Sequence, residues 1–264
     1  MMCNHDWIKC GNEKICLLCG QVVKADEPAP EDVQGVDKFI NQIIHGDCLE
    51  VMKEIPDNYV DLVVTDPPYK LTGGGRGDGA NSKRPKGMLS KNEQNLFDVP
   101  KFEDWLPEVY RVLKEGSHCY IFVNFKNLSE LMNKTSVVGF KHSNLLVWEK
   151  NNCTPSQYYM KNAEYVLLCY KGPAKYINDI GGSKTVHKFN NVIGNKVHPT
   201  EKPIDLLEFY IKNSSKEKEL VLDPFAGSGT TAIACLNTDR QYIGIELDEQ
   251  YVEIARRRIN AVRE

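Results

Sequence analysis

From about residue 39 onward, short apolar runs alternate along this chain with stretches whose apolar residues lie three and four positions apart. The segment 59–65 is rich in β-branched residues and predicts a buried strand. The segment 105–113 has the spacing of an amphipathic helix, which we expect to end near Gly116. Other apolar runs predict strands at 41–44, 119–123, 145–148, 165–168, 219–222 and 242–245.

Helical patterns fall between these runs. Helices are expected at 48–54, 128–134 and 230–236, from Pro203 onward, and from Glu249 to the end. Alternating strands and helices predict an α/β, Rossmann-like fold, in which a mostly parallel sheet carries helices on both faces. Such open sheets bind ligands beyond the carboxyl ends of their strands, so the loops at that edge are the first place to look for chemistry.

Composition places few further limits on the protein. The 264 residues are 41% hydrophobic and 26% charged, as in ordinary soluble proteins. The sequence contains no apolar run of membrane-spanning length and no apolar signal segment at its start, so we expect a cytoplasmic protein. The formal net charge of -3 argues against a generally basic nucleic-acid binder but is compatible with a local basic surface.

Four of the nine cysteines crowd the first nineteen residues. The pairs Cys3-x-His5 and Cys16-x-x-Cys19 predict a zinc-knuckle-like module over residues 1–23, in which a structural Zn²⁺ replaces a hydrophobic core. Cys10 is an alternative ligand, and a set of free cysteines is the alternative to a metal site. An acidic linker at 24–37 then separates this module from one large domain at 38–264.

The first candidate site is the loop Asp66-Pro67-Pro68-Tyr69, which follows the strand at 59–65. The two prolines fix φ and remove two backbone donors, so the Asp66 carboxylate and the Pro67 carbonyl form a rigid pair of acceptors. Such a pair suits an amino group with two N–H donors, and Tyr69 offers a flat surface for a base removed from its duplex. A plain turn is the alternative, because Asp-Pro pairs are common in turns.

The second candidate site is glycine-rich. Asp223 ends a predicted strand and is followed by Gly227-Ser228-Gly229 and a helix, which is the layout of a nucleotide-binding turn. The third glycine of the dinucleotide pattern and the Gly-Lys-Ser/Thr of a phosphate-binding loop are both missing. Glu246 ends the next strand, where a carboxylate can take both hydroxyls of a ribose. A turn that serves only helix packing is the alternative.

Five motifs follow one another along the chain: Gly46-Asp47-Cys48-Leu49-Glu50, Thr65-Asp66-Pro67-Pro68-Tyr69, His198-Pro199-Thr200-Glu201-Lys202-Pro203, Asp223-Pro224-Phe225-Ala226-Gly227-Ser228-Gly229-Thr230-Thr231 and Gly244-Ile245-Glu246. In this order they resemble the β-group of S-adenosylmethionine-dependent DNA amino-methyltransferases. In that group the catalytic motif precedes the cofactor motif, a circular permutation of the usual order. The resemblance covers residues 40–264 nearly end to end.

This resemblance implies a role for each matched residue. The loop Asp66-Pro67-Pro68-Tyr69 would be catalytic and would hold the target amino group of a flipped-out base. Glu246 would bind the ribose hydroxyls of S-adenosylmethionine. The other cofactor contacts would come from Asp47, Cys48, Asp66, Thr200, Lys202, Asp223, Phe225, Gly227, Ser228, Gly229 and Thr230.

The expected partner is double-stranded DNA. A glycine-rich stretch at 70–97 is expected to close over phosphates with the basic residues Lys70, Arg76, Lys83, Arg84 and Lys86, although a solvated loop without that role is the alternative. Target recognition would fall to about 170–196, which includes Lys171 and His187 and is short for the family. A short target, a homodimer or help from another segment would compensate.

Asp66 as the first residue of its motif resembles the adenine-N6 members more than the cytosine-N4 members, which more often carry serine. The sequence therefore favours site-specific methylation of adenine N6, with cytosine N4 as the alternative. A catalytically inactive zinc-containing DNA-binding protein is a reading from a different class, and an RNA or protein substrate is compatible with the motif. Neither the recognition sequence nor a restriction endonuclease partner follows from the sequence.

Overall fold

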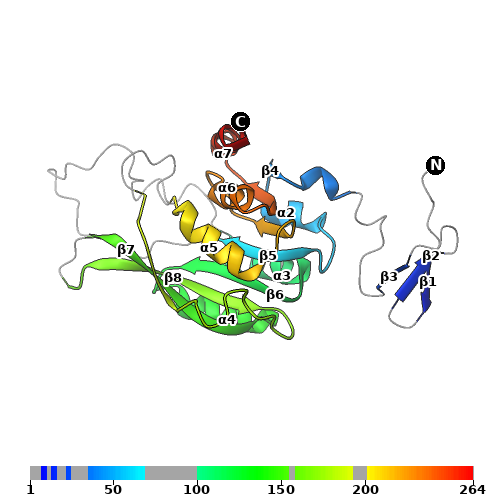
Figure 1. The fold of residues 1–264 in the computed structure, drawn as a ribbon, viewed down its shortest axis with the longest axis horizontal. Coiled ribbons are helices and arrows are strands. Elements are labelled where there is room, and N and C mark those ends of the chain that lie inside the picture. Colours follow the sequence, from blue (N-terminus) through cyan, green and yellow to red (C-terminus); the bar gives the residue numbers. More distant parts are fainter. Residues whose placement is uncertain are drawn as a thin grey trace.

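The computed structural model describes residues 7–10, 13–16, 22–24, 35–68, 100–154, 158–192 and 201–263. Its largest feature is an eight-stranded sheet with the strand order β4-β11-β10-β5-β6-β8-β7-β9 (Figure 1). The strands are β4 Gln42–His45, β5 Val60–Thr65, β6 Leu113–Val123, β7 Lys141–Thr154, β8 Lys161–Tyr170, β9 Val186–Phe189, β10 Leu220–Asp223 and β11 Gln241–Glu246.

The strands β4, β11, β10, β5 and β6 pair in parallel. The strand β8 runs antiparallel to both of its neighbours, β6 and β7, and β9 pairs in parallel with β7. The predicted mostly parallel sheet is therefore confirmed, with β8 reversed within it. Because the five parallel strands all end at one edge, the loops after β4, β5, β10 and β11 are brought together there.

Helices cover both faces of this sheet. One buried cluster joins the sheet to α2 Cys48–Lys53, α3 Phe102–Val112 and α4 Leu128–Val138, together with the short 3-10 helix η1 Asp37–Phe39. A second buried cluster joins the opposite face to α5 Ile204–Ser214, α6 Thr230–Asn237 and α7 Glu249–Arg263. Residues along β5 alternate between these clusters, since Val63 belongs to the first, and Leu62 and Val64 to the second.

Four strands differ from the prediction made from the hydrophobic pattern. The strand β6 begins directly after α3 and runs through Gly116, instead of starting at 119. Both β7 and β8 are longer than the apolar runs at 145–148 and 165–168, because backbone pairing continues through their polar ends. No strand was predicted between 171 and 195, but this segment contains β9, whose Val186-His187-Lys188-Phe189 carries too few apolar residues to stand out.

The strands β1 Trp7–Cys10, β2 Glu13–Cys16 and β3 Val22–Lys24 form a separate three-stranded antiparallel sheet. Of the predicted zinc ligands, Cys3, His5 and Cys19 lie outside the described residues, as does the side chain of Cys16. No group of metal-ligating side chains occurs within the part of the chain that is described. The zinc site therefore stays a prediction.

The stretch expected to be an acidic linker includes one residue of the core, since Val36 is fully buried against the sheet. Among the helices that the structure describes, none is long and apolar enough to cross a membrane.

Candidate active site

The loop after β5 presents an unusual carboxylate. Asp66 directly follows the buried strand β5, and the next residue, Pro67, is buried. The Asp66 Oδ2 accepts a hydrogen bond from the Lys202 ammonium group. Its Oδ1 is buried and has no hydrogen-bond partner among the described residues. Burial raises the pKa of Asp66, and the Lys202 ammonium opposes that shift. A buried acceptor without a donor costs free energy, which is consistent with a place reserved for a ligand N–H group.

Lys202 forms ion pairs with two carboxylates, Asp66 and Glu164. Its ammonium lies 3.5 Å from Glu164 of β8, and Glu164 in turn accepts a hydrogen bond from Lys150 of β7. Burial works against ionisation of Glu164, but the two ammonium groups outweigh it and lower its pKa. Lys202 also lies over the Phe122 ring, with its nitrogen 5.1 Å from the ring centroid. The four charged groups alternate in sign, and their charges sum to zero.

The glycine-rich turn is built around Asp223, the last residue of β10. Its buried carboxylate accepts hydrogen bonds from the hydroxyls of Thr65 (2.9 Å) and Thr231 (2.6 Å), and from the Phe225 backbone amide (3.1 Å). Burial raises the pKa of Asp223 to about 6, although all three donors favour the charged form. Asp223 therefore organises the turn from below, and its carboxylate is committed to the protein.

Close packing explains why the turn needs glycine. Gly229 has a φ of 79°, which L residues rarely adopt, and a Cβ added there would lie 2.8 Å from the Ala255 Cβ of α7. Gly244 of β11 meets the same limit, because a Cβ there would lie 2.5 Å from Ile43 and 3.1 Å from Ala226. Glycine at position 229 therefore lets the turn approach α7, and glycine at position 244 lets Ala226 of the turn lie directly on β11.

The structure brings Glu246 and Asp47 to the same edge of the sheet. The Glu246 carboxylate accepts hydrogen bonds from the backbone amides of Gly227 (2.8 Å) and Asp248 (2.9 Å), which fixes it beside the turn. The Gly46 amide donates a hydrogen bond to the Glu246 carbonyl (3.0 Å). The next residue, Asp47, caps the start of α2 by accepting a hydrogen bond from the Leu49 amide, so α2 begins next to Glu246. The motif segments containing these two residues therefore lie together, as their predicted roles require.

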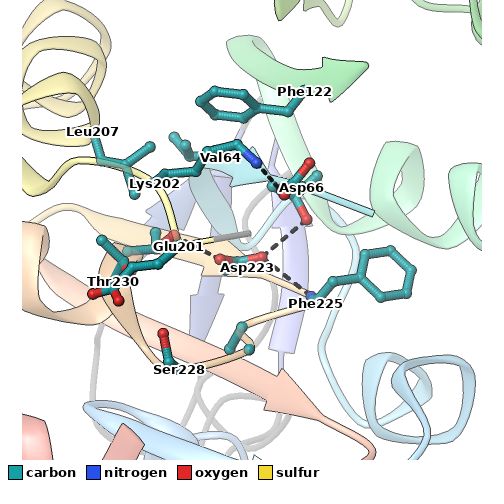
Figure 2. A pocket seen from close by; sticks show the side chains of 14 residues that line it. Val64, Asp66, Phe122, Glu201, Lys202, Leu207, Asp223, Phe225, Ser228 and Thr230 are labelled. Carbon is teal, nitrogen blue, oxygen red and sulfur yellow. Dashed lines mark hydrogen bonds and ion pairs between the residues drawn. The ribbon is translucent and has the colours of Figure 1, made fainter. Parts of the chain in front are cut away.

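A single pocket joins the two predicted loops (Figure 2). Asp66 and Lys202 lie on one side of it, Phe225 and Ser228 lie on another, and Gly227 also belongs to its lining. The rest of its lining is Val64, Thr65, Phe122, Glu201, Leu207, Asp223, Ala226, Thr230 and Thr231. Loops separated by more than 150 residues in the sequence therefore share one cavity. This lining does not include four other predicted cofactor contacts, Gly229, Glu246, Asp47 and Cys48. Cys48 is buried, and burial raises the pKa of its thiol to about 12.

One residue that holds this pocket together was missed in the sequence. Arg258 of α7 donates to the Ser228 carbonyl (2.7 Å) and to its hydroxyl (2.8 Å), and it forms an ion pair with Glu201. Glu201 directly precedes Lys202, so Arg258 links the glycine-rich turn to the segment that carries the lysine. Nothing local marks this residue, because it is one of three consecutive arginines on a helix.

Several predicted residues lie outside the described residues: Tyr69, Thr200, Lys70, Arg76, Lys83, Arg84 and Lys86. Within the predicted recognition region 170–196, the two residues named above, Lys171 and His187, are part of the fold. Lys171 is buried and donates to the carbonyls of Tyr110 and Leu113 and to the Asn58 side chain. His187 is buried beside Tyr210. These two residues therefore stabilise the sheet and are not available to DNA.

A DNA methylase family model matches residues 60–257. The chain belongs to this DNA methylase family. A type II methyltransferase of Moraxella bovis, M2.MboI, is 30% identical over 251 residues, which cover 86% of this chain and 89% of the relative. Together these matches make the protein an S-adenosylmethionine-dependent amino-methyltransferase, as the order of the motifs implied.

Two solved methyltransferases share the fold. The M1.HpyAVI complex with S-adenosylmethionine superimposes with a TM-score of 0.63 and 27% identity, covering 83% of this chain and 99% of that one. The cytosine-N4-specific PvuII DNA methyltransferase has a TM-score of 0.62 at 21% identity, covering 83% of this chain and 90% of that one, which shows the fold alone.

The arrangement around Arg258 predicts a loss of stability in Arg258→Ala. The Glu201 side chain is only 7% exposed, and the substitution removes its ion pair with Arg258 together with two hydrogen bonds to Ser228, so we expect the free energy of unfolding in urea to fall by about 3–5 kcal/mol. Adding Glu201→Gln should recover part of that loss. Arg257→Ala is the matched control, since Arg257 is exposed on the same helix and should change stability by less than about 0.5 kcal/mol. Equal effects of the two arginine variants would contradict the assignment.

Proposed function

We propose that this protein is a site-specific DNA methyltransferase that transfers a methyl group from S-adenosylmethionine to the exocyclic N6 of adenine. The observation that carries the proposal is the buried Oδ1 of Asp66, which has no hydrogen-bond partner among the described residues and belongs to a residue that lines the same pocket as the glycine-rich turn. This carboxylate oxygen and the adjacent Pro67 carbonyl are two acceptors, and an amino group with two N–H donors suits such a pair. The base would have to leave the duplex to reach this buried position.

The residues around the pocket fit S-adenosylmethionine, which supplies an electrophilic methyl group when bound. Glu246, held beside the turn by Gly227, would take the ribose hydroxyls, and Lys202 would lie near the carboxylate of the amino acid part. Gly227, Ser228 and Phe225 would line the methionine part, and Asp47 would reach the adenine amino group. Phe225 is itself fixed by an edge contact with Trp105, with ring centroids 5.3 Å apart.

The protein's own chemistry is positioning. The lone pair of an exocyclic amino nitrogen is delocalised into the ring, so the nitrogen is a poor nucleophile. Hydrogen bonds to Asp66 Oδ1 and the Pro67 carbonyl would favour a tetrahedral nitrogen and would stabilise the positive charge that develops on it. Lys202 holds the other Asp66 oxygen, so the carboxylate cannot rotate away from the target.

Adenine is favoured over cytosine by Asp66 as the first residue of its motif, and cytosine N4 remains the alternative because its amino group offers the same two N–H donors. The experiment is to methylate unmodified DNA with the purified protein, digest it to nucleosides and identify the product by mass. We expect N6-methyldeoxyadenosine. N4-methyldeoxycytidine would overturn the choice of base, and transfer to neither base would overturn the proposed activity.

The role of Asp66 predicts that Asp66→Ala lowers kcat by at least about 10²–10³-fold, because the main acceptor for the target amino group is lost. The dissociation constant for S-adenosylmethionine, measured by calorimetry, should change by only a few-fold. Asp57→Ala is the control, since Asp57 is a carboxylate that precedes the first residue of β5, at the end opposite Asp66. This variant should keep near wild-type turnover. Full turnover in Asp66→Ala would refute the assignment.

We also propose that Cys3, His5, Cys16 and Cys19 bind one structural Zn²⁺. The support is the spacing of the two ligand pairs alone. Metal analysis of the purified full-length protein should find about one zinc per chain, and Cys16→Ser should lose it. Cys153→Ser is the matched control, because Cys153 is an exposed free cysteine of β7 and should retain full zinc content. Zinc that survives Cys16→Ser would exclude this ligand set.

A further inference from the structure

The hairpin formed by β7 and β8 extends beyond the edge at which the active site lies. The last residue of β6, Val123, pairs with Tyr165, so residues 161–164 of β8 continue past the end of β6 (Figure 1). On the other side of β6, Thr65 of β5 pairs with Ile121. The outer part of the hairpin is therefore on the same side of the sheet edge as Asp66.

This outer part carries large apolar side chains in solvent. Tyr158, Tyr159 and Met160 are 88%, 95% and 61% exposed. Phe125, just after β6, is 58% exposed, and the Lys161 ammonium lies 5.6 Å from the centroid of its ring. Scattered exposed apolar residues are ordinary, but four close together beside an active site indicate an interaction surface.

The electrostatics of this surface narrow the choice of partner. The described segments 124–127 and 158–163 contain two lysines, Lys126 and Lys161, and no carboxylate. Both lysines are exposed, so the apolar cluster has a cationic border. A surface of aromatic rings and ammonium groups fits a nucleic-acid strand, whose bases offer flat faces and whose phosphates carry negative charge.

The distance to the active site suits the same partner. Glu164 lies 3.5 Å from Lys202, which contacts Asp66. Lys161 precedes Glu164 by three residues, so it lies about 10 Å further out along the strand. Successive base pairs rise by about 3.4 Å, so this span corresponds to roughly three base pairs from a nucleotide held at Asp66.

We propose that the tip of the β7–β8 hairpin, residues 158–161 together with Phe125, packs against the DNA strand that flanks the target nucleotide. This inference rests on the proposed methylation of DNA. Roughly three nucleotides from the target, the strand would present phosphates to Lys161 and apolar sugar and base surfaces to the aromatic side chains at the hairpin tip. The contact would contribute to DNA affinity and would leave the cofactor pocket unchanged.

The test compares Tyr159→Ala with Val137→Ala, using unmethylated plasmid DNA as substrate. Val137 is an apolar residue of similar exposure, 85%, near the end of α4, and Lys141, four residues on, pairs with Tyr170 at the opposite edge of the sheet. Tyr159→Ala should weaken DNA binding and lower kcat/KM for DNA by about tenfold, because one base–aromatic contact is lost. Val137→Ala should match wild type in both measurements. Tyr159→Phe keeps the ring and should stay within about twofold of wild type.

The affinity for S-adenosylmethionine should be equal in all four proteins, which separates a DNA contact from damage to the pocket. Wild-type DNA affinity and kcat/KM in Tyr159→Ala would overturn the inference while leaving the proposed function intact. A change of oligomeric state in Tyr159→Ala with unchanged DNA affinity would overturn it as well, since the partner would then be a second copy of the chain. A wild-type protein that methylates no DNA would instead refute the proposed function.

Discussion

The active site depends on one buried carboxylate shared between two strands. Asp223 ends β10 and accepts a 2.9 Å hydrogen bond from Thr65, which ends β5, so the catalytic loop and the glycine-rich turn begin from a common point. Parallel pairing of Val221 with Leu62 sets the register that makes this contact available. Burial opposes the charge of Asp223 and raises its pKa to about 6, so the arrangement is stable only because three donors converge on the group.

Lys202 supplies a second constraint, from a segment far from both loops in sequence. A lysine that is about nine-tenths buried needs compensating charge, and it has Asp66 on one side and Glu164 on the other. Its neighbour Glu201 is tied through Arg258 to the carbonyl of Ser228. The segment before α5 is thereby fixed to the catalytic loop, to β8 and to the glycine-rich turn at once.

The sequence predicted those parts of the fold and site whose signals are local. The strand before Asp66 is β-branched, and the turn at Gly227 and Gly229 is marked by its glycines, so both were identified in the right places. The roles of Glu164 and Arg258 arise only from strand register and helix packing, and each looks like an ordinary surface charge in the sequence. Lys171 shows the converse error, because a basic residue in a region expected to read DNA is held by backbone carbonyls instead.

The alternation of charges around Asp66 bears on how the proposed reaction is stabilised. Positive charge developing on the target nitrogen would be attracted by Asp66, yet an isolated Lys202 beside the same carboxylate would weaken that attraction. Glu164 offsets part of the ammonium charge, and Lys150 in turn keeps Glu164 ionised, as its lowered pKa indicates. Lys202 would therefore orient Asp66 without cancelling its negative charge, and the Asp66 Oδ1 would remain an acceptor for the target amino group. On this argument Glu164 and Lys150 would act as positioning residues in the proposed reaction, although neither lines the pocket.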